Sequence, residues 1–242
     1  MNKVEQLAEI IKNSKYAVAF TGAGASTDSG LADFRGKQGL YNERSYMGYE
    51  PEEILSHDFF FAHRDIFDKY LEEKLSINDI KPNAGHKALA ELEKMGKIKA
   101  VITQNIDDLH QAAGSIKVLE LHGTLKKWYC LKCGKIDTKS FECDCGGSVR
   151  PNVTLYGEML DEDIVSEAVR EIEKADTLII IGTSLTVYPA AFYINYFKGE
   201  NLVIINETET SRDNKATLVI RERFADVMKG VMDILKKDNI HD

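Results

Sequence analysis

The chain has 242 residues, of which 43% are hydrophobic and 29% charged, and its formal net charge is -8 at pH 7. This composition excludes a disordered chain, and the negative charge argues against a protein that binds nucleic acid by neutralising its phosphates. No apolar run approaches the roughly 20 residues of a membrane helix, and the N-terminal segment has no signal-peptide core, so we expect a cytoplasmic protein with no membrane partner.

Apolar runs alternate with amphipathic segments along most of the chain. Amphipathic helices are predicted over residues 2–13, 83–95, 164–172 and 227–235, with Asn2 and Asn83 as caps of the first two. Strands are predicted over residues 16–20, 98–103, 116–121, 177–181, 202–205 and 216–220. Because most of these strands are apolar along their whole length, we expect a parallel sheet that is buried on both faces.

Two segments interrupt this alternation. Residues 37–80 are rich in aromatic and charged residues without a clear strand, and they predict a small helical module. The cysteines form a second insertion. We therefore expect a Rossmann-like α/β fold with two inserted modules. The predicted boundaries are 1–35, 82–122 and 153–242 for the discontinuous Rossmann-like domain, 36–81 for the helical module and 123–152 for the module that contains the cysteines.

A glycine-rich loop, TGAGASTDSGLADFRG, follows the first predicted strand. Gly22 and Gly24 allow a sharp turn and a close approach to a pyrophosphate, and a helix that starts after the turn would direct N–H groups at it. Thr27 occupies the third glycine position of the usual pattern, so a tight turn with no ligand is an alternative. Residues 33–35, Asp-Phe-Arg, either line a cleft or form a surface ion pair beside a core phenylalanine.

Polar residues follow two further strands. TQNIDDLH comes after the strand over 98–103 and places Gln104, Asn105 and Asp107 where ligands bind in open α/β sheets. These side chains can bond a ribose or a carboxamide, or can cap a helix. His122 ends the strand over 116–121, and an imidazole there can act as a general base near neutral pH. We expect the other histidines to pack or to lie on the surface.

All four cysteines fall within one short segment with the spacing C-x2-C-x9-C-x-C. Four thiolates suit a closed, tetrahedral, structural zinc site. Residues two apart on a strand point to opposite faces, so the second pair can bind one metal only if the chain turns there, which Gly146 and Gly147 permit. Reduced thiols without a metal are the alternative. The predicted ligands are Cys130, Cys133, Cys143 and Cys145.

Together these motifs resemble those of the sirtuins, which are NAD-dependent protein deacylases. The glycine loop, TQNIDDLH, the HG of LHGTL, the cysteine quartet, RPNVTLYGE, GTSLTVYPAA and INET occur in the family's order over nearly the whole chain. The resemblance implies NAD as a co-substrate, one structural zinc ion and the acetylated lysine of protein substrates. We further expect a monomer that binds no specific nucleic acid.

The resemblance also implies roles for individual positions. His122 would be the general base, with Asn105 as a second catalytic residue. NAD would contact Gly22, Ala23, Gly24, Thr27, Asp33, Phe34, Arg35, Gln104, Asn105, Ile106, Asp107, His122, Gly182, Thr183, Ser184, Asn206, Glu207, Ala225 and Asp226. The substrate peptide would add as a strand at Val153, Leu155, Gly157, Glu158, Val187 and Tyr188. In the implied reaction the acyl oxygen attacks the anomeric carbon of NAD as nicotinamide leaves, giving lysine and O-acyl-ADP-ribose.

The acyl group is the least constrained part of this interpretation. Sirtuins that prefer succinyl or malonyl lysine carry a tyrosine and an arginine three residues apart in the helical module, where this chain has Asp68 and Leu71. Because an arginine is needed to pair an acyl carboxylate, we expect a preference for acetyl-lysine. The alternatives are a longer-chain deacylase or protein mono-ADP-ribosyltransferase on the same fold, a non-catalytic nucleotide sensor, and a zinc-ribbon nucleic-acid binder.

Overall fold

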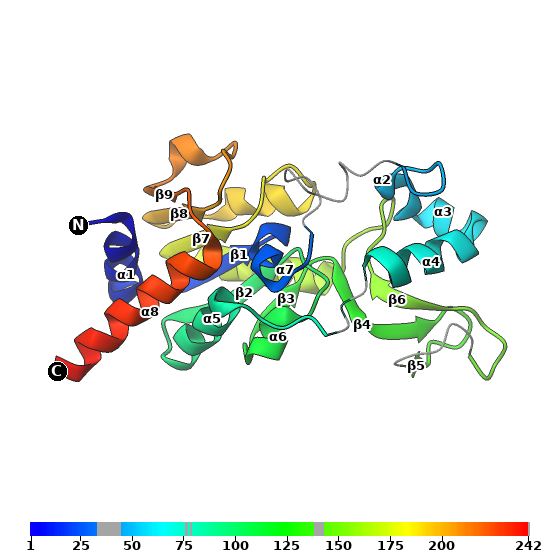
Figure 1. The fold of residues 1–242 in the computed structure, drawn as a ribbon, viewed down its shortest axis with the longest axis horizontal. Coiled ribbons are helices and arrows are strands. Elements are labelled where there is room, and N and C mark those ends of the chain that lie inside the picture. Colours follow the sequence, from blue (N-terminus) through cyan, green and yellow to red (C-terminus); the bar gives the residue numbers. More distant parts are fainter. Residues whose placement is uncertain (33–44, 76, 78, 138–142, 242) are drawn as a thin grey trace.

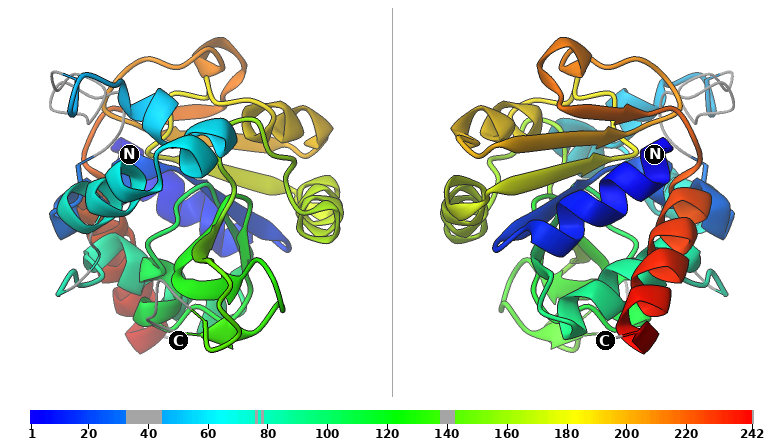
Figure 2. Two further views of the ribbon diagram at one scale, coloured as in Figure 1. Left: turned by 90° about the vertical axis from the view of Figure 1, so that its right-hand side faces the viewer. Right: turned by 90° about the vertical axis from the view of Figure 1, so that its left-hand side faces the viewer.

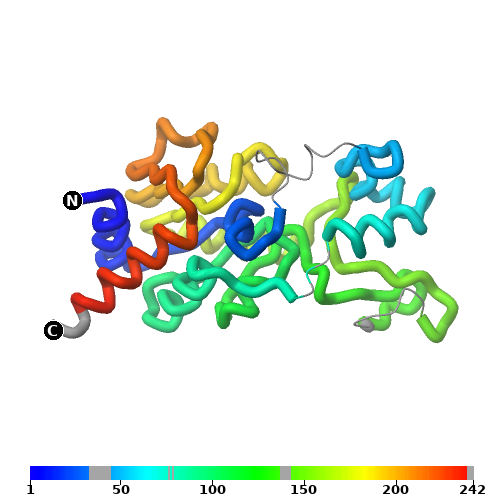
Figure 3. The backbone as a smooth tube through the Cα atoms, in the orientation of Figure 1, coloured from blue at the N-terminus to red at the C-terminus, as the bar shows by residue number. Residues whose placement is uncertain are grey.

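The computed structural model describes residues 1–32, 45–75, 77, 79–137 and 143–241. The molecule is elongated, with a larger α/β part at the end that carries both termini and a smaller part of helices and strands at the other end (Figure 1). The smoothed backbone shows that a light-blue to cyan stretch and a green stretch of the chain form the smaller part, while both termini lie in the larger part (Figure 3). The smaller part is therefore inserted into the larger one, as the apolar pattern predicts.

A six-stranded parallel sheet forms the centre of the larger part, in the order β3-β2-β1-β7-β8-β9. Its strands are β1 (Ala17–Thr21), β2 (Ile98–Thr103), β3 (Val118–Glu120), β7 (Thr177–Ile181), β8 (Asn201–Ile205) and β9 (Leu218–Ile220). Strand order reverses direction between β1 and β7. In an open α/β sheet, this reversal opens a crevice at the carboxyl ends of the two strands.

Helices cover both faces of this sheet. Those on one face are α1 (Lys3–Asn13), α5 (Ala84–Lys94) and α8 (Phe224–His241), and those on the other are α7 (Glu162–Lys174) and the short helix η4 (Ala190–Tyr196) (Figure 2). Successive residues of each central strand point to opposite faces. Thus Ala19 packs with the first group of helices and Phe20 with the second, and the two cores share a sheet that is buried on both sides.

Side-chain caps fix where two of the predicted helices begin. The Asn2 side chain accepts a hydrogen bond from the Glu5 N–H at the start of α1, and the Glu5 carboxylate accepts one from the Asn2 N–H. Asn83 caps α5 by accepting from the N–H groups of Gly85 and His86. Both capped helices of the sequence analysis are confirmed, because each cap satisfies N–H groups that the helix itself leaves unpaired.

The smaller part packs three helices against an antiparallel sheet of order β5-β4-β6. The helices are α2 (Pro51–Ile54), α3 (His57–Ala62) and α4 (Arg64–Lys74), and the strands are β4 (Gly123–Cys130), β5 (Ile136–Asp137) and β6 (Val149–Val153). Phe60, Phe67 and Tyr70 form its core, with Trp128 of β4 partly buried against them. Aromatic residues of the helical segment thus serve as the packing surface between the two inserted modules.

One local prediction is wrong. No α-helix follows β1 within residues 22–32, where the chain forms two single turns of 3-10 helix, η1 (Ala23–Ala25) and η2 (Thr27–Ser29). Gly30 then adopts a φ of 95°, a left-handed conformation that ends the second turn. Glycine and small hydroxyl residues favour turns over helix, and here they prevail. In the described part of the chain, no helix could cross a membrane.

Candidate functional site

Two glycine-containing loops contact each other directly at the carboxyl ends of β1 and β7. The Gly22 N–H donates to the Ile181 carbonyl at 2.9 Å, and the Gly24 N–H donates to the Gly182 carbonyl at 2.8 Å. Gly182 has a φ of 60°, and a Cβ added there would lie 2.2 Å from the backbone nitrogen of Ala25. These glycines therefore allow the loops to touch, in addition to any approach to a ligand.

Two of the predicted amide and carboxylate residues meet the glycine loop. The Ser26 hydroxyl donates to Asp107 Oδ2 at 2.6 Å, and Asn105 Nδ2 donates to Ser26 Oγ at 3.1 Å. Asp107 Oδ1 also accepts from the Leu109 N–H at 3.0 Å, at the start of α6 (Leu109–Ala113). Burial raises the pKa of Asp107, although the Ser26 hydrogen bond opposes this rise. Asp107 thus contacts both the glycine loop and the first N–H of α6, whose N-cap residue is Asp108.

A chain of hydrogen bonds between buried hydroxyl and imidazole groups leads to the backbone of Asn105. The Asn105 N–H and the Thr21 hydroxyl both donate to Thr103 Oγ1, at 3.0 and 2.9 Å. Thr21 Oγ1 then accepts from His110 Nε2 at 3.0 Å, because its own proton is used for Thr103. The His110 ring packs against His86 at 4.7 Å between centroids. Burial lowers the pKa of both histidines, to about 4 for His86, so these imidazoles are neutral and serve packing.

His122 has the tautomer that a general base requires. Its Nδ1 lies 2.8 Å from the backbone carbonyl of Gln104, which can only accept, so Nδ1 carries the proton. In the neutral ring Nε2 therefore keeps a lone pair. Burial lowers the pKa of His122, although the hydrogen bond to the Gln104 carbonyl opposes this, so the ring is neutral at pH 7. The Gln104 side chain donates to Thr183 Oγ1 at 3.1 Å and links this histidine to the loop after β7.

The remaining predicted nucleotide-binding residues surround the same edge of the sheet. Ser184 bonds Thr186 in the loop after β7, and Asn206 at the end of β8 donates to the Thr208 carbonyl at 2.8 Å. Ala23 and Thr27 lie in the two 3-10 turns after β1, Ile106 follows β2, Glu207 follows β8, and Ala225 and Asp226 lie in the first turn of α8. Arg223 pairs with Asp28 at 3.0 Å and with Asp226 at 3.2 Å, which connects the start of α8 to the glycine loop. Asp33, Phe34 and Arg35 lie outside the described residues.

The four cysteines converge on one point in the smaller part. Their Sγ atoms all lie within 4.8 Å of one another. The Cys130 and Cys145 sulfurs are 3.5 Å apart, and those of Cys133 and Cys143 are 3.7 Å apart. A tetrahedral zinc ion with Zn–S bonds of about 2.3 Å would place its sulfurs about 3.8 Å apart. The four residues therefore fit a zinc ion, and the C-x-C pair contributes both of its sulfurs.

Glycines at two turns make this convergence possible. Gly134 and Gly146 adopt φ values of 72° and 71°, one after each cysteine pair. A Cβ at Gly147 would lie 2.6 Å from Cys130 Sγ, so only glycine leaves room for the sulfur. Asp144 points elsewhere, since its carboxylate is largely exposed and pairs with Lys135 at 3.0 Å.

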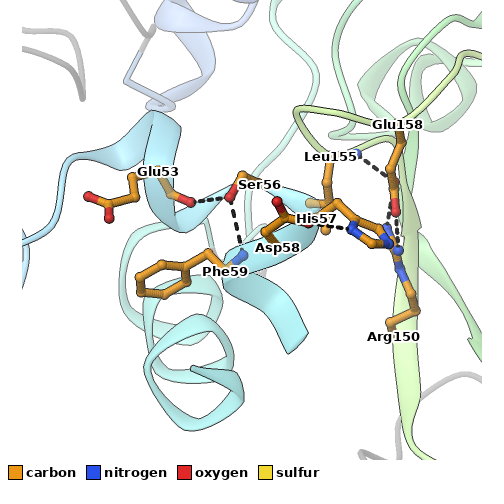
Figure 4. Close-up of polar contacts among 8 residues, drawn as sticks. All are labelled: Glu53, Ser56, His57, Asp58, Phe59, Arg150, Leu155 and Glu158. Atoms are coloured by element: carbon orange, nitrogen blue, oxygen red, sulfur yellow. Dashed lines mark hydrogen bonds and ion pairs between the residues drawn. The ribbon is translucent and has the colours of Figure 1, made fainter. Parts of the chain in front are cut away.

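The predicted peptide-binding residues lie on two segments. The segment over residues 153–158 lies beside the helical module, where Tyr156 forms a bridge with Ser56. Leu155 and Glu158 of this segment are drawn near Ser56 and His57 in Figure 4. The Tyr156 N–H donates to the Leu55 carbonyl and the Tyr156 carbonyl accepts from the His57 N–H, each at 2.9 Å. On the second segment, the Val187 carbonyl accepts from the Ala191 N–H, and the Tyr188 side chain is 70% exposed.

Sequence reasoning did not assign several residues that hold this site together. Ser26 joins the glycine loop to Asp107 and Asn105, and Thr21 and Thr103 support Asn105. Arg150 bonds the segment over 153–158. A hydroxyl residue at a strand end or inside a glycine loop is a usable signal for the first three. Arg150 opens the RPNVTLYGE motif of the sequence analysis, but the motif alone assigned it no role.

Comparison with known proteins identifies similar chains over almost the full length. The model of the Sir2 family matches residues 22–189. A protein of Fusobacterium nucleatum named NAD-dependent protein deacetylase is 60% identical and covers 97% of this chain and 93% of its own length. A structure described as Sir2-p53 peptide-NAD+ has a TM-score of 0.86 at 38% identity, covering 97% of this chain and 99% of its own. One described as Sir2 bound to acetylated peptide has a TM-score of 0.85 at 36% identity, covering 97% and 99%.

Proposed function

The chain belongs to the Sir2 family, and we propose that it is an NAD-dependent protein lysine deacetylase, which transfers the acetyl group to ADP-ribose and releases nicotinamide. The observation that carries this proposal is His122, whose Nδ1–H is held by the Gln104 carbonyl and whose Nε2 is left as a base. The histidine is bonded to Gln104, which precedes Asn105, and Asn105 and Asp107 both bond Ser26 of the glycine loop.

NAD is the co-substrate, and its anomeric carbon is the electrophile that receives the acetyl oxygen. His122 Nε2 takes a proton from a ribose hydroxyl, and Asn105 acts beside it. Asp107 and Gln104 bind the nicotinamide and its ribose, while the glycine loop binds the pyrophosphate. The adenosine side is bound by Thr183, Ser184, Asn206, Glu207, Ala225 and Asp226. Supporting this arrangement, the described positions in it gather at one edge of the parallel sheet.

One zinc ion, bound by the four cysteines, has a structural role. The site has four protein ligands and no open position, which is the arrangement of structural rather than catalytic zinc. The acetylated peptide adds as a strand between residues 153–158 and 187–188. We assign residues 1–35, 82–122 and 153–242 to the NAD-binding domain, 36–81 to the helical module and 123–152 to the zinc-binding module. The protein acts as a monomer in the cytoplasm, which size-exclusion chromatography with light scattering and cell fractionation would test.

The reaction is tested by mass spectrometry of an acetyl-lysine peptide incubated with the purified protein, with and without NAD. The expected result is loss of acetyl only with NAD, with equal amounts of nicotinamide and O-acetyl-ADP-ribose. Label from NAD that stays on protein, with the peptide still acetylated, would instead identify a mono-ADP-ribosyltransferase. Removal of long-chain acyl groups in preference to acetyl would identify a longer-chain deacylase.

The pH dependence of turnover follows from the environment of His122. The base must be neutral, and burial places its pKa below 6.5, the ordinary value. We therefore expect kcat/KM for the peptide to be constant near pH 7 and to fall through one protonation below pH 6.5. Initial rates between pH 5.5 and 8 measure this, with circular dichroism at each pH to confirm that the protein is folded. An acidic limb centred above pH 6.5 would contradict the assignment.

The acyl preference follows from the two positions in α4. The Asp68 carboxylate accepts from Arg64 Nε at 2.7 Å, and Leu71 is buried in the core of the smaller part. Neither offers a cation to a succinyl carboxylate, and an unpaired carboxylate in a desolvated site costs several kcal/mol. We expect kcat/KM for an acetyl peptide to exceed that for the matching succinyl peptide by at least about 100-fold. A faster succinyl rate in the same assay would refute this preference.

A further inference from the structure

Arg150 is a buried cation that the mechanism above does not use. It lies on β6 in the predicted zinc-binding module, and its side chain is 4% exposed. Its guanidinium donates to both carboxylate oxygens of Glu158, at 2.5 and 3.0 Å (Figure 4). It also donates to the Val153 carbonyl at 2.7 Å. Phe60 and Tyr129 lie 5.2 and 5.9 Å from the guanidinium carbon. One side chain therefore holds both ends of the segment over residues 153–158.

Glu158 also forms hydrogen bonds to the backbone in the middle of the segment. Its Oε2 accepts from the Leu155 N–H at 2.8 Å, and its own N–H donates to the Leu155 carbonyl at 3.0 Å. Burial acts to raise the pKa of Glu158, but the Arg150 guanidinium and the Leu155 N–H outweigh it, so the pKa is lowered and the group is a carboxylate at neutral pH. Thus Glu158 faces inward to Arg150 and the segment's own backbone.

The helical module also forms hydrogen bonds to the segment, at Tyr156. Tyr156 is paired with Leu55 and His57, so its backbone polar groups face α3. Arg150 and the helical module therefore hold the segment in one conformation. The chain is extended at Val153, where β6 ends, and turns over residues 155–158, where Gly157 has a φ of 90°.

We propose that Arg150 is a positioning residue for the protein substrate, which fixes residues 153–158 through Glu158 as the segment on which the acetylated peptide pairs. This inference rests on the proposed function, because it assumes that the peptide binds to this segment. In this proposal, the antiparallel sheet that contains β4 and β6 contributes to substrate affinity as well as having a structural role. Arg150 makes no contact with the reacting atoms, so its effect falls on peptide binding and not on the chemical step.

Arg64 provides a matched control on the same aromatic ring. Its guanidinium carbon lies 4.7 Å from the Phe60 centroid, and it donates to the Val149 carbonyl at 2.5 Å and to Asp68. Both arginines therefore stack on Phe60 and bond the backbone of β6. Of these two arginines, only Arg150 has a described hydrogen bond to the segment over 153–158.

The test compares Arg150→Gln, Glu158→Gln and Arg64→Gln in steady-state kinetics with an acetyl peptide. For Arg150→Gln and Glu158→Gln we expect the peptide KM to rise at least tenfold, with kcat and the KM for NAD within about twofold of the parent. The double variant should match the single ones, because the two residues act as a pair. Arg64→Gln should leave both KM values unchanged. If Arg150→Gln does not fold, Glu158→Gln, which keeps the side-chain shape, carries the test.

Fluorescence anisotropy with a labelled acetyl peptide separates the two hypotheses. If the parent protein neither binds nor deacetylates the peptide, the proposed function fails. If the parent does both and the Glu158→Gln and Arg150→Gln variants bind the peptide as tightly as it does, the role of Arg150 is refuted. An equal rise in peptide KM for Arg64→Gln would also refute it, since the effect would then come from general loosening of the smaller part.

Discussion

Replacing His122 with alanine is expected to lower kcat for deacetylation by about 100- to 10,000-fold, the usual contribution of a positioned general base. The lone pair on Nε2 is lost, and no other described histidine can replace it, because His86 and His110 are buried away from the crevice with their pKa values lowered. Thermal unfolding should change little, since His122 is partly exposed and its side chain makes one hydrogen bond, to the Gln104 carbonyl. Steady-state rates and a melting curve measure both effects.

His122→Asn separates the base from the hydrogen bond. The amide nitrogen can still donate to the Gln104 carbonyl in place of Nδ1, but no basic nitrogen remains at the position of Nε2. We expect this variant to be as inactive as His122→Ala and to bind NAD and peptide like the parent. Turnover within tenfold of the parent in both variants would exclude His122 as the base.

Loss of the metal is the second large effect expected. Cys145→Ser removes one of the four thiolates and leaves three sulfurs arranged around a point that no longer binds zinc tightly. Structural zinc in small domains contributes about 10–16 kcal/mol of binding free energy. Losing even part of this free energy would destabilise the protein more than an ordinary substitution does. A loss of about 4 kcal/mol would lower the midpoint of thermal unfolding by roughly 8–16 °C. Elemental analysis should show one zinc per parent chain and less than about 0.1 per variant chain.

Asp144→Asn is the matched control for this substitution. Asp144 lies between two of the cysteines, and its exposed ion pair with Lys135 is of the kind that contributes little. We expect this variant to retain its zinc and its melting temperature. Full zinc content in Cys145→Ser would contradict the four-sulfur site and favour the alternative of reduced thiols without a metal.

The parts of the fold that could be predicted from sequence are those that depend on local patterns. The run over residues 98–103 is apolar and ends in polar residues, and β2 has these bounds. Asn83 precedes a helical period and caps α5. The aromatic residues of the 37–80 segment indicated helices, and α2–α4 lie there. In each case the determining contacts are within a few residues.

The features that escaped prediction depend on contacts between distant residues. Ser26 and Asp107 are 81 positions apart, and Gly24 meets Gly182 through a strand pairing that no local pattern indicates. The helix expected after Gly24 is absent from residues 22–32, because the loop is shaped by its contact with the turn after β7. The sequence predicted that the four cysteines share one site, but it did not show which sulfurs are neighbours. Cys130 lies next to Cys145 and Cys133 next to Cys143 because of how the two turns face each other.

The bridge between Tyr156 and the helical module has a thermodynamic consequence. Fixing a backbone residue costs roughly 1–2 kcal/mol of conformational entropy, and in this chain the bonds from Leu55, His57 and Glu158 order residues 155–158 during folding. A partner that pairs with an already ordered strand loses only its own freedom. Backbone pairing on such a template makes few demands on side chains, which favours an enzyme that accepts many different sequences around the modified lysine.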